Sequence, residues 1–330
     1  MLARLAALPP PLRRRTLWLV VALALVPAPA APRPDARRAA EAALAPPCRQ
    51  GSWSSGAAGE RRLRPSIVAF CRLGAWVDHY DVGLDPVASA RDLARHRVGT
   101  LYLQTGRYSD AADLVRPELL GRWLQAAHAA GLRVVGWYLP GYGRWLERDV
   151  RRTVAVAGFR GPGGQAFDAL AVDVEHREPG DREAFDAGVA AHLARVRRQV
   201  GTGYPIGAIV PAPLGMALYA ARWAGFPWRS IAADADVVQT MGYWSYREGC
   251  RSGPGNCPYA YTSGNLADAA RLTGLPVHAI GGVADAVSAA DVAEFVRAAR
   301  DGRAVGASLY DYATTQPAFW PSLERLARPG

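Results

Sequence analysis

The stretch FDALAVDVEH, residues 167–176, has the pattern of a buried β-strand that ends in two carboxylates. Side chains alternate across a strand, so Asp173 and Glu175 point to the same face. The opposite face carries three aliphatic side chains, Leu170, Val172 and Val174. Two carboxylates on an apolar strand are costly unless they have partners or a chemical role. This spacing raises the pKa of at least one of them, as an acid catalyst at neutral pH requires.

Strand-like apolar runs recur on both sides of this stretch. They cover residues 74–80, 98–105, 132–139, 167–175, 204–211, 235–243, 276–282 and 304–311. Helical patterns lie between them, at residues 86–96, 111–130, 181–200 and 288–300. Eight strands alternating with helices over about 250 residues predict the α/β class and a (β/α)8 TIM barrel. A doubly wound open sheet is the alternative, but no Gly-x-Gly-x-x-Gly motif follows the first strand.

Two helix-end signals accompany these patterns. Ser288 precedes Ala-Ala-Asp and predicts an N-cap. Gly131 and Gly302 follow helical segments and predict left-handed C-terminal caps.

The N-terminal residues have the pattern of an export signal. Three arginines at 13–15 precede 11 apolar residues at 16–26, and the Ala-Pro-Ala of 28–30 is a small-x-small cleavage site. A helix that spans a bilayer needs about 20 apolar residues, so this run is too short. We therefore predict a signal peptide over residues 1–30 and no stable membrane span after its cleavage. The mature protein would be secreted or extracellular, or associated with the cell envelope, with an uncleaved anchor as the alternative.

Composition divides the rest of the chain into two parts. Residues 31–70 are rich in Ala, Pro, Arg, Gly and Ser, which predicts a linker or a loosely ordered extension. The barrel domain is expected over residues 71–325. The formal net charge is +10, and all basic residues are arginines. They are scattered, and the pairs 151–152 and 197–198 have the pattern of solvated helix faces. No basic patch with interleaved aromatics occurs, so we predict no nucleic-acid partner.

The chain has four cysteines, and an even number in an exported protein favours disulfides. Cys250 and Cys257 flank a turn-rich loop and are expected to pair. Cys48 would then join the extension to the domain through Cys71. A zinc site is disfavoured because there is no Cys-x-x-Cys and no suitably spaced His. We predict no metal and no cofactor.

In (β/α)8 barrels the functional residues lie at the C-terminal ends of the strands. Acids, aromatics and amides gather at these ends here, which is typical of a site for a polysaccharide or oligosaccharide. Aromatic faces stack on sugars, while carboxylates and amides bind hydroxyls. For each single aromatic, packing at the barrel rim is the alternative. The predicted substrate-binding residues are Asp78, Tyr80, Gln104, Tyr138, Gln239, Met241, Tyr243, Trp244, Tyr310 and Asp311.

The fourth strand resembles the signature of family 18 glycoside hydrolases, the chitinase-like enzymes, which reads D-x-x-D-x-D-x-E. Asp168, Asp173 and Glu175 match its first, third and last acidic positions, and Ala171 stands where the second Asp is expected. A short D-x-E also occurs in the family 25 lysozyme-like barrels, so the resemblance is to the superfamily.

The sixth strand carries a second point of resemblance. Met241-Gly242-Tyr243 is similar to the M-x-Y of family 18, although Trp244 replaces the usual Asp. The resemblance implies that Glu175 is the general acid. It implies that Asp173 and Tyr243 hold a substrate 2-acetamido group, the internal nucleophile of substrate-assisted hydrolysis.

Three other mechanisms or functions stay open. In a two-carboxylate mechanism, Glu175 would be the acid and Asp78, Asp173 or Asp311 its partner. A non-catalytic glycan-binding barrel is the main alternative, because a fold does not establish chemistry. A metal-dependent hydrolase would use Asp78, His79, Asp173, Glu175 and His176. It is disfavoured because adjacent strand residues face opposite sides and no H-x-H or H-E-x-x-H occurs.

Overall fold

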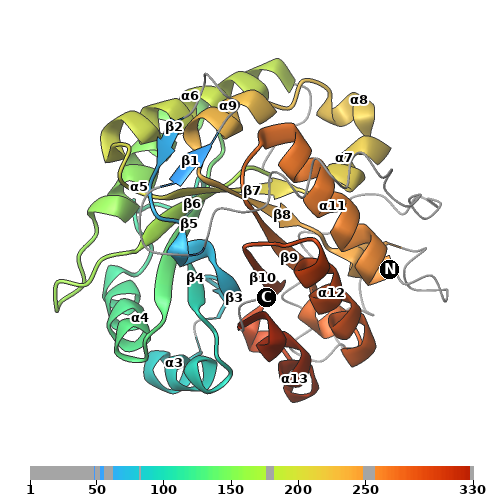
Figure 1. Ribbon diagram of the computed structural model, residues 1–330. Helices are drawn as coiled ribbons and strands as arrows, with labels where there is room; N and C mark the ends of the chain where they lie inside the picture. Colours follow the sequence, from blue (N-terminus) through green and yellow to red (C-terminus); the bar gives the residue numbers. More distant parts are fainter. Residues whose placement is uncertain are drawn as a thin grey trace, which may run out of the picture.

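The computed structural model describes residues 48, 53–55, 62–81, 83–175, 182–247 and 257–327. Eight parallel strands close into a barrel with the order β10-β3-β4-β5-β6-β7-β8-β9, and helices surround it (Figure 1). The strands are β3 (Arg72–Val77), β4 (Thr100–Arg107), β5 (Arg133–Leu139), β6 (Ala169–Asp173), β7 (Ile206–Pro211), β8 (Val237–Met241), β9 (Val277–Val283) and β10 (Gly306–Tyr310). The predicted (β/α)8 TIM barrel is confirmed. Residues 167–176 contain its fourth strand, β6.

The longer helices of the outer ring are α3 (Pro86–Arg95), α4 (Pro117–Ala129), α5 (Leu146–Gly158), α6 (Arg182–Val200), α11 (Cys257–Thr273) and α12 (Ala289–Asp301). Shorter helices are α7 (Pro213–Leu218), α8 (Ala220–Trp223), α9 (Trp228–Asp234) and α13 (Trp320–Leu323). The helix predicted over 111–130 begins only at Pro117, because Arg116 has a left-handed backbone with φ 51°. Proline at the first helical position then starts the helix.

The helix-end predictions had different outcomes. Ser288 caps α12 in a reciprocal capping box with Asp291, as predicted. Gly131 has φ 83°, in the left-handed region, as predicted. The prediction for Gly302 was wrong, since its φ is −78° and Arg303 has the left-handed φ of 52°. Glycine at 302 avoids a steric clash, because a Cβ there would lie 2.8 Å from the Leu266 side chain.

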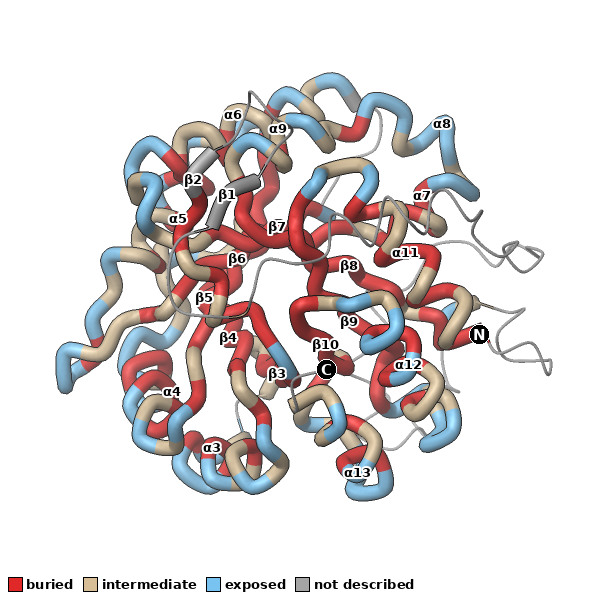
Figure 2. The backbone as a smooth tube through the Cα atoms, viewed as in Figure 1, coloured by how far each residue is buried: buried red, intermediate tan, exposed pale blue. Residues whose placement is uncertain are grey.

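The strands separate two apolar cores. Leu170, Val172 and Val174 pack outward in the larger core between the sheet and the helices, as their alternation predicted. Ala169 and Ala171 pack inward with the side chains that fill the barrel. Figure 2 shows the strands buried inside a ring of helices whose outer surfaces are exposed.

The segment before β3 closes the N-terminal end of the barrel. Phe70, in the short 3-10 helix η2 (Val68–Phe70), is fully buried and packs with the inner core. The predicted disulfide between Cys48 and Cys71 is confirmed, with the two sulfurs 2.14 Å apart. The region predicted as a linker also contains a two-stranded antiparallel sheet, β1 (Trp53–Ser55) and β2 (Arg62–Arg64).

Several predictions fall on residues outside the described part of the chain. The signal peptide over 1–30 is one of them. Cys250 is another; Cys257 is buried at the start of α11 and is not a free thiol, so the pairing of these two cysteines stays a prediction. Within the described residues, no helix is both long and apolar enough to cross a membrane.

The predicted solvated faces at 151–152 and 197–198 are wrong for one arginine of each pair. Arg152 is 1% exposed and donates to the carbonyls of Arg107 and Tyr108 at 2.8 and 3.0 Å. Arg197 is 5% exposed and donates to several carbonyls around it. A guanidinium has five donors and can replace water with carbonyl groups, which periodicity alone does not reveal.

A buried ion triad stabilises the N-terminal end of the barrel. The Asp236 carboxylate lies between Arg197, at 2.6 Å, and Arg64, at 3.4 Å, and all three side chains are buried. It also accepts the Ile206 amide at 2.9 Å. Arg64 ends β2, so this triad connects the N-terminal segment to the start of β7 and β8.

Replacing Asp236 by Ala should leave two buried guanidinium groups without their carboxylate. We expect the free energy of unfolding to fall by about 3–5 kcal/mol, measured by denaturant unfolding. The matched control is Asp268→Ala, which breaks an ion pair with Arg271 at the surface of α11. That change should cost less than about 1 kcal/mol. Equal losses in the two variants would contradict the role of the triad.

Candidate active site

The C-terminal mouth of the barrel is floored by one side chain from each of four alternate strands. Gln104 of β4, Asp173 of β6, Met241 of β8 and Tyr310 of β10 point inward here; the last three end their strands, and Gln104 directly precedes a bulge in β4. In a (β/α)8 barrel such a set forms one interior layer. All four residues were predicted from the sequence as site residues, and the alternation of the strands brings them together.

The next interior layer is apolar. It consists of Trp76, Trp137, Ile209 and Ile280 from the other four strands, all buried in the inner core. The two indole rings meet edge to face with their centroids 5.9 Å apart. Asp173 therefore lies on a floor of hydrocarbon and indole rings.

This floor determines the ionisation of Asp173. The side chain is 6% exposed, and its Oδ1 has no hydrogen-bond partner. Burial raises the pKa of the Asp173 carboxyl well above its ordinary value, and the neighbouring Glu175 charge raises it further. Glu175 follows β6 in a turn and has an exposed surface. Desolvation by the protein around the mouth also raises the pKa of the Glu175 carboxyl.

Ala171, where the chitinase-like signature has an Asp, lies one layer below the tryptophans. Its strand partner is Trp137, and it is 1% exposed. Gln239 belongs to the same deeper layer and is fully buried. The Gln239 amide oxygen would lie 2.5 Å from a Cβ at Gly207. The structure thus places Gln239 beneath the mouth, apart from Glu175.

The side of the mouth opposite β6 carries a second acidic group. Tyr310 donates its hydroxyl to Asp78 Oδ2 at 2.7 Å, and the Tyr80 amide donates to Asp78 Oδ1 at 2.7 Å. Asp311 caps the 3-10 helix η6 (Tyr312–Thr314) by accepting the Thr314 amide at 3.0 Å. Among the described residues, one carboxylate oxygen each of Asp78, Asp81 and Asp311 lies within 4.8 Å of the others. Such oxygens suit hard cations, but acids near a surface also gather without one.

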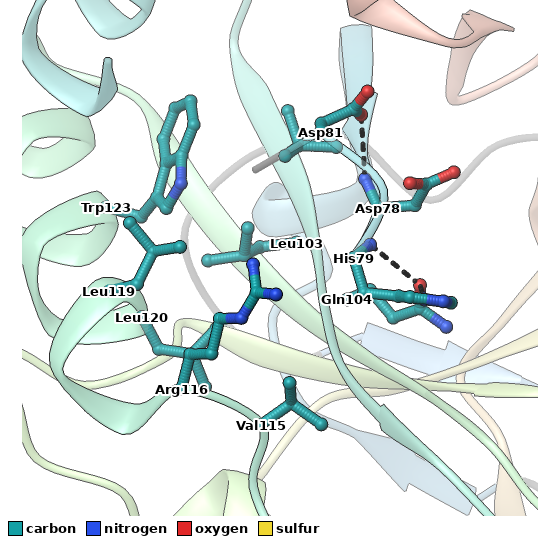
Figure 3. Close-up of a pocket in the computed structure, with 11 residues that line it drawn as sticks. Asp78, His79, Asp81, Leu103, Gln104, Val115, Arg116, Leu119, Leu120 and Trp123 are labelled. Atoms are coloured by element: carbon teal, nitrogen blue, oxygen red, sulfur yellow. Dashed lines mark hydrogen bonds between the residues drawn. The ribbon is translucent and has the colours of Figure 1, made fainter. Parts of the chain in front are cut away.

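A small pocket adjoins this acidic group between β3, β4 and α4 (Figure 3). Gln104 Oε1 accepts the His79 amide at 3.1 Å and lies 2.6 Å from His79 Nδ1. The rest of the lining is mostly apolar and includes Val77, Leu103, Val115, Arg116, Leu119, Leu120 and Trp123. The Gln104 amide oxygen is thus already occupied by His79 on the pocket side of β4.

Tyr243 lies between the two acidic groups. Burial raises the pKa of its hydroxyl, and the charges of Glu175, Asp173 and Asp311 raise it further, which places all three carboxylates near this one ring. Its centroid is 6.2 Å from that of Tyr310. The M-x-Y tyrosine is therefore near Asp173, Glu175 and Asp311, and its role toward a substrate stays a prediction.

Two predicted site residues face away from the mouth. Trp244 is 2% exposed and packs outward against Phe295 of α12, with ring centroids 5.1 Å apart. Tyr138 follows the inward Trp137, so it faces outward, and its hydroxyl donates to Asp149 Oδ1 at 2.7 Å. The structure does not bring either side chain to Asp173 and Glu175.

Asp149 is a structural element of the site that the sequence did not reveal. This fully buried carboxylate on α5 accepts the amides of Gly141 and Tyr142, at 3.0 and 2.8 Å. It thereby fixes the loop after β5, in which Tyr142 has a φ of 58°. In sequence, Asp149 resembles an ordinary acid in the first turn of a helix, because its partners precede that helix.

No family model and no curated protein matches this chain. Solved structures do match its fold. A chitinase from Rhizomucor miehei is 14% identical, covers 77% of this chain and 99% of its own, and has a TM-score of 0.53. An endo-beta-1,4-mannanase from Thermotoga petrophila is 12% identical, with 78% and 76% covered and a TM-score of 0.57. A chitinase-like agglutinin from Robinia pseudoacacia is 12% identical, with 77% and 99% covered and a TM-score of 0.56.

The chain resembles the TIM-barrel glycoside hydrolases in fold. Identities this low establish the fold alone. The three matched proteins are named as a chitinase, a mannanase and an agglutinin. The shared barrel therefore leaves the choice between cleavage and binding to the residues at its mouth.

Replacing Asp173 by Asn should stabilise the protein at neutral pH. A carboxyl whose pKa is raised by folding is neutral in both states in strong acid. As the pH rises above about 4, the unfolded chain releases this proton while the folded protein keeps it. The carboxyl therefore lowers the stability of the folded protein at higher pH. We expect Asp173→Asn to gain more than about 1 kcal/mol at pH 7 and nothing near pH 3, measured by unfolding across pH.

Asp168→Asn is the matched control with the opposite sign. Burial alone would raise the pKa of Asp168, but hydrogen bonds from His128, the Val134 amide and Arg133 together lower it. This variant should lose stability at neutral pH, and the loss should shrink as the pH falls. A destabilised Asp173→Asn at pH 7 would contradict the assignment of Asp173 as a buried, raised carboxyl.

Proposed function

We propose that this protein is a secreted glycoside hydrolase that cleaves glycosidic bonds in a polysaccharide, with Glu175 as the general acid. The observation that carries the proposal is the pair of neighbouring carboxylates, Asp173 and Glu175, at the C-terminal mouth of the barrel. One member is buried and the other is exposed, and the pKa of each is raised. This is the arrangement that an acid catalyst needs.

The proposed chemistry begins with a protonated Glu175. Its raised pKa favours the protonated form, and its exposed position gives a substrate access. Glu175 gives its proton to the glycosidic oxygen as the bond from that oxygen to the sugar carbon breaks. The oxygen leaves as a hydroxyl, and Glu175 becomes a carboxylate. Water then adds to the sugar carbon, directly or after an internal 2-acetamido oxygen has attacked it, and Glu175 accepts the proton that this water releases.

Asp173 and Tyr243 are proposed to hold the sugar whose bond is cleaved. Asp173 Oδ1 is buried and unpartnered, and Tyr243 lies near both carboxylates. A polar substituent of the sugar would supply the hydrogen bonds that this buried carboxyl otherwise lacks. In family 18, which this strand resembles, that substituent is a 2-acetamido group.

The other proposed binding residues surround this pair at different depths. Asp78, Tyr80, Gln104, Met241, Tyr310 and Asp311 lie at the mouth and are proposed to contact the glycan. Tyr138, Gln239 and Trp244 are proposed to support it by packing, in line with their buried positions. Secretion is proposed from the predicted signal peptide and is supported by the Cys48–Cys71 disulfide, since disulfides persist in oxidising compartments.

A non-catalytic glycan-binding barrel is the second candidate. Two observations favour it, both departures from the chitinase-like pattern. Ala171 removes the second acidic position of the strand, and Trp244 packs outward against α12, where the family has an Asp. Asp173 then lacks a neighbouring carboxyl below it to share a proton.

Glu175→Gln distinguishes the two candidates. Glutamine keeps the shape of the side chain but cannot donate the acidic proton. We expect cleavage of a polysaccharide panel to fall by roughly 10²–10⁴-fold while glycan binding is retained. Reducing-end release and binding would be measured on the same panel.

Glu183→Gln, on the exposed surface of α6, is the matched control and should cleave like wild type. If wild type and Glu175→Gln behave alike on the panel, the hydrolase proposal fails and the non-catalytic glycan-binding barrel is favoured. A chelator should leave activity unchanged; loss with recovery on adding Zn²⁺ would instead support the metal-dependent alternative.

A further inference from the structure

Two of the most exposed large apolar side chains of the described residues lie at the barrel mouth. They are Tyr80, which is 39% exposed and follows β3, and Tyr246, which is 41% exposed and ends the 3-10 helix η4 (Trp244–Tyr246) after β8. Both are aromatic, and the sequence did not single out Tyr246. Aromatic rings at the mouth of a barrel are the usual lining of a ligand site.

These two tyrosines are the ends of a continuous row of contacts. From Tyr246 the row passes to Tyr243, whose ring centroid is 6.2 Å away, and then to Tyr310, at a further 6.2 Å. Tyr310 donates to Asp78 at 2.7 Å, and Asp78 accepts the Tyr80 amide at 2.7 Å. We call these five residues the tyrosine row.

The tyrosine row lies mostly across the mouth from the acidic pair, and Tyr243 is its member close to that pair. Its members lie at the C-terminal ends of β8, β10 and β3. In the barrel order β10 and β3 are neighbours, and β9 separates β10 from β8. Asp173 ends β6 and Glu175 follows it, and β6 is four strands from β10 in the barrel order. Tyr243 is close enough to both carboxylates for their charges to raise the pKa of its hydroxyl. A chain that follows the row would thus pass the acidic pair at Tyr243, next to the Tyr246 end of the row.

The two end tyrosines are held in place by their own contacts. Arg107 Nη1 donates to the Tyr80 hydroxyl at 3.4 Å, and the Tyr80 ring lies 3.9 Å from that of His79. The Tyr246 ring meets Tyr243 edge to face at 81°. Neither ring belongs to the two apolar cores. Rings that are fixed before binding lose little conformational entropy when a ligand packs on them.

We propose that the tyrosine row binds an extended glycan chain across the mouth, with Tyr80 and Tyr246 as platforms for sugars beyond the cleaved bond. The substrate is then a polymer that is cut at internal bonds. This inference rests on the proposed function and adds the direction of the chain and Tyr246 as a binding residue.

The test measures how affinity depends on glycan length. Binding of disaccharides and hexasaccharides would be measured in the Glu175→Gln background, which prevents cleavage. The probes are oligomers of N-acetylglucosamine and of β-1,4-linked mannose. Adding Tyr246→Ala or Tyr80→Ala should weaken hexasaccharide binding roughly tenfold while changing disaccharide binding less than twofold. Tyr246→Trp should retain the hexasaccharide affinity, because it keeps an aromatic face.

Tyr259→Ala is the matched control. Tyr259 lies on α11, where its hydroxyl donates to Asp301 at 2.9 Å, and the change should not affect either ligand. Affinity that does not increase with length, or equal losses for both lengths, would overturn the tyrosine row but not the hydrolase. Absence of binding to both sugar series would also overturn the tyrosine row, whereas the hydrolase proposal is decided separately by cleavage of the polysaccharide panel. Wild-type cleavage only from chain ends would overturn internal cutting alone.

Discussion

The closed barrel leaves room for only four side chains in each interior layer, and the site depends on how these layers are filled. The top layer holds Asp173, and the layer beneath it holds two tryptophans and two isoleucines. A carboxyl above such a floor has no solvent below it and no ion pair with the described residues. The pKa of Asp173 rises for that reason, and burial also raises the pKa of Glu175, two residues further along the chain.

The same limit on space gives a physical account of the altered signature. Trp137 is the strand partner of residue 171, and its ring occupies the interior just above that position. A carboxylate at 171 would be enclosed under this indole with no described cation beside it. Alanine avoids that cost, and Asp173 is left without the neighbouring acid that chitinase-like enzymes have. The support for Asp173 at the mouth must come from groups at its own level, such as Tyr243.

The groups at the N-terminal end of the barrel stabilise the fold. Phe70 closes it, the Cys48–Cys71 disulfide holds the preceding segment, and Asp236 joins Arg64 to Arg197. None of these groups contributes to the mouth. This division is general in such barrels: the N-terminal face carries stability and the C-terminal face carries function, so the loops at the mouth can vary without loss of the fold.

Local periodicity and simple counting of residues were enough to predict the eight strands, the inward face of Asp173, the Ser288 cap and the Cys48–Cys71 pair. The tertiary structure decided the depth and direction of the remaining side chains. Only the stagger between neighbouring strands places Gln239 two layers below the mouth. Only distant partners make Arg152 buried and turn Trp244 toward Phe295. Those contacts join residues far apart in the chain, and no local pattern encodes them.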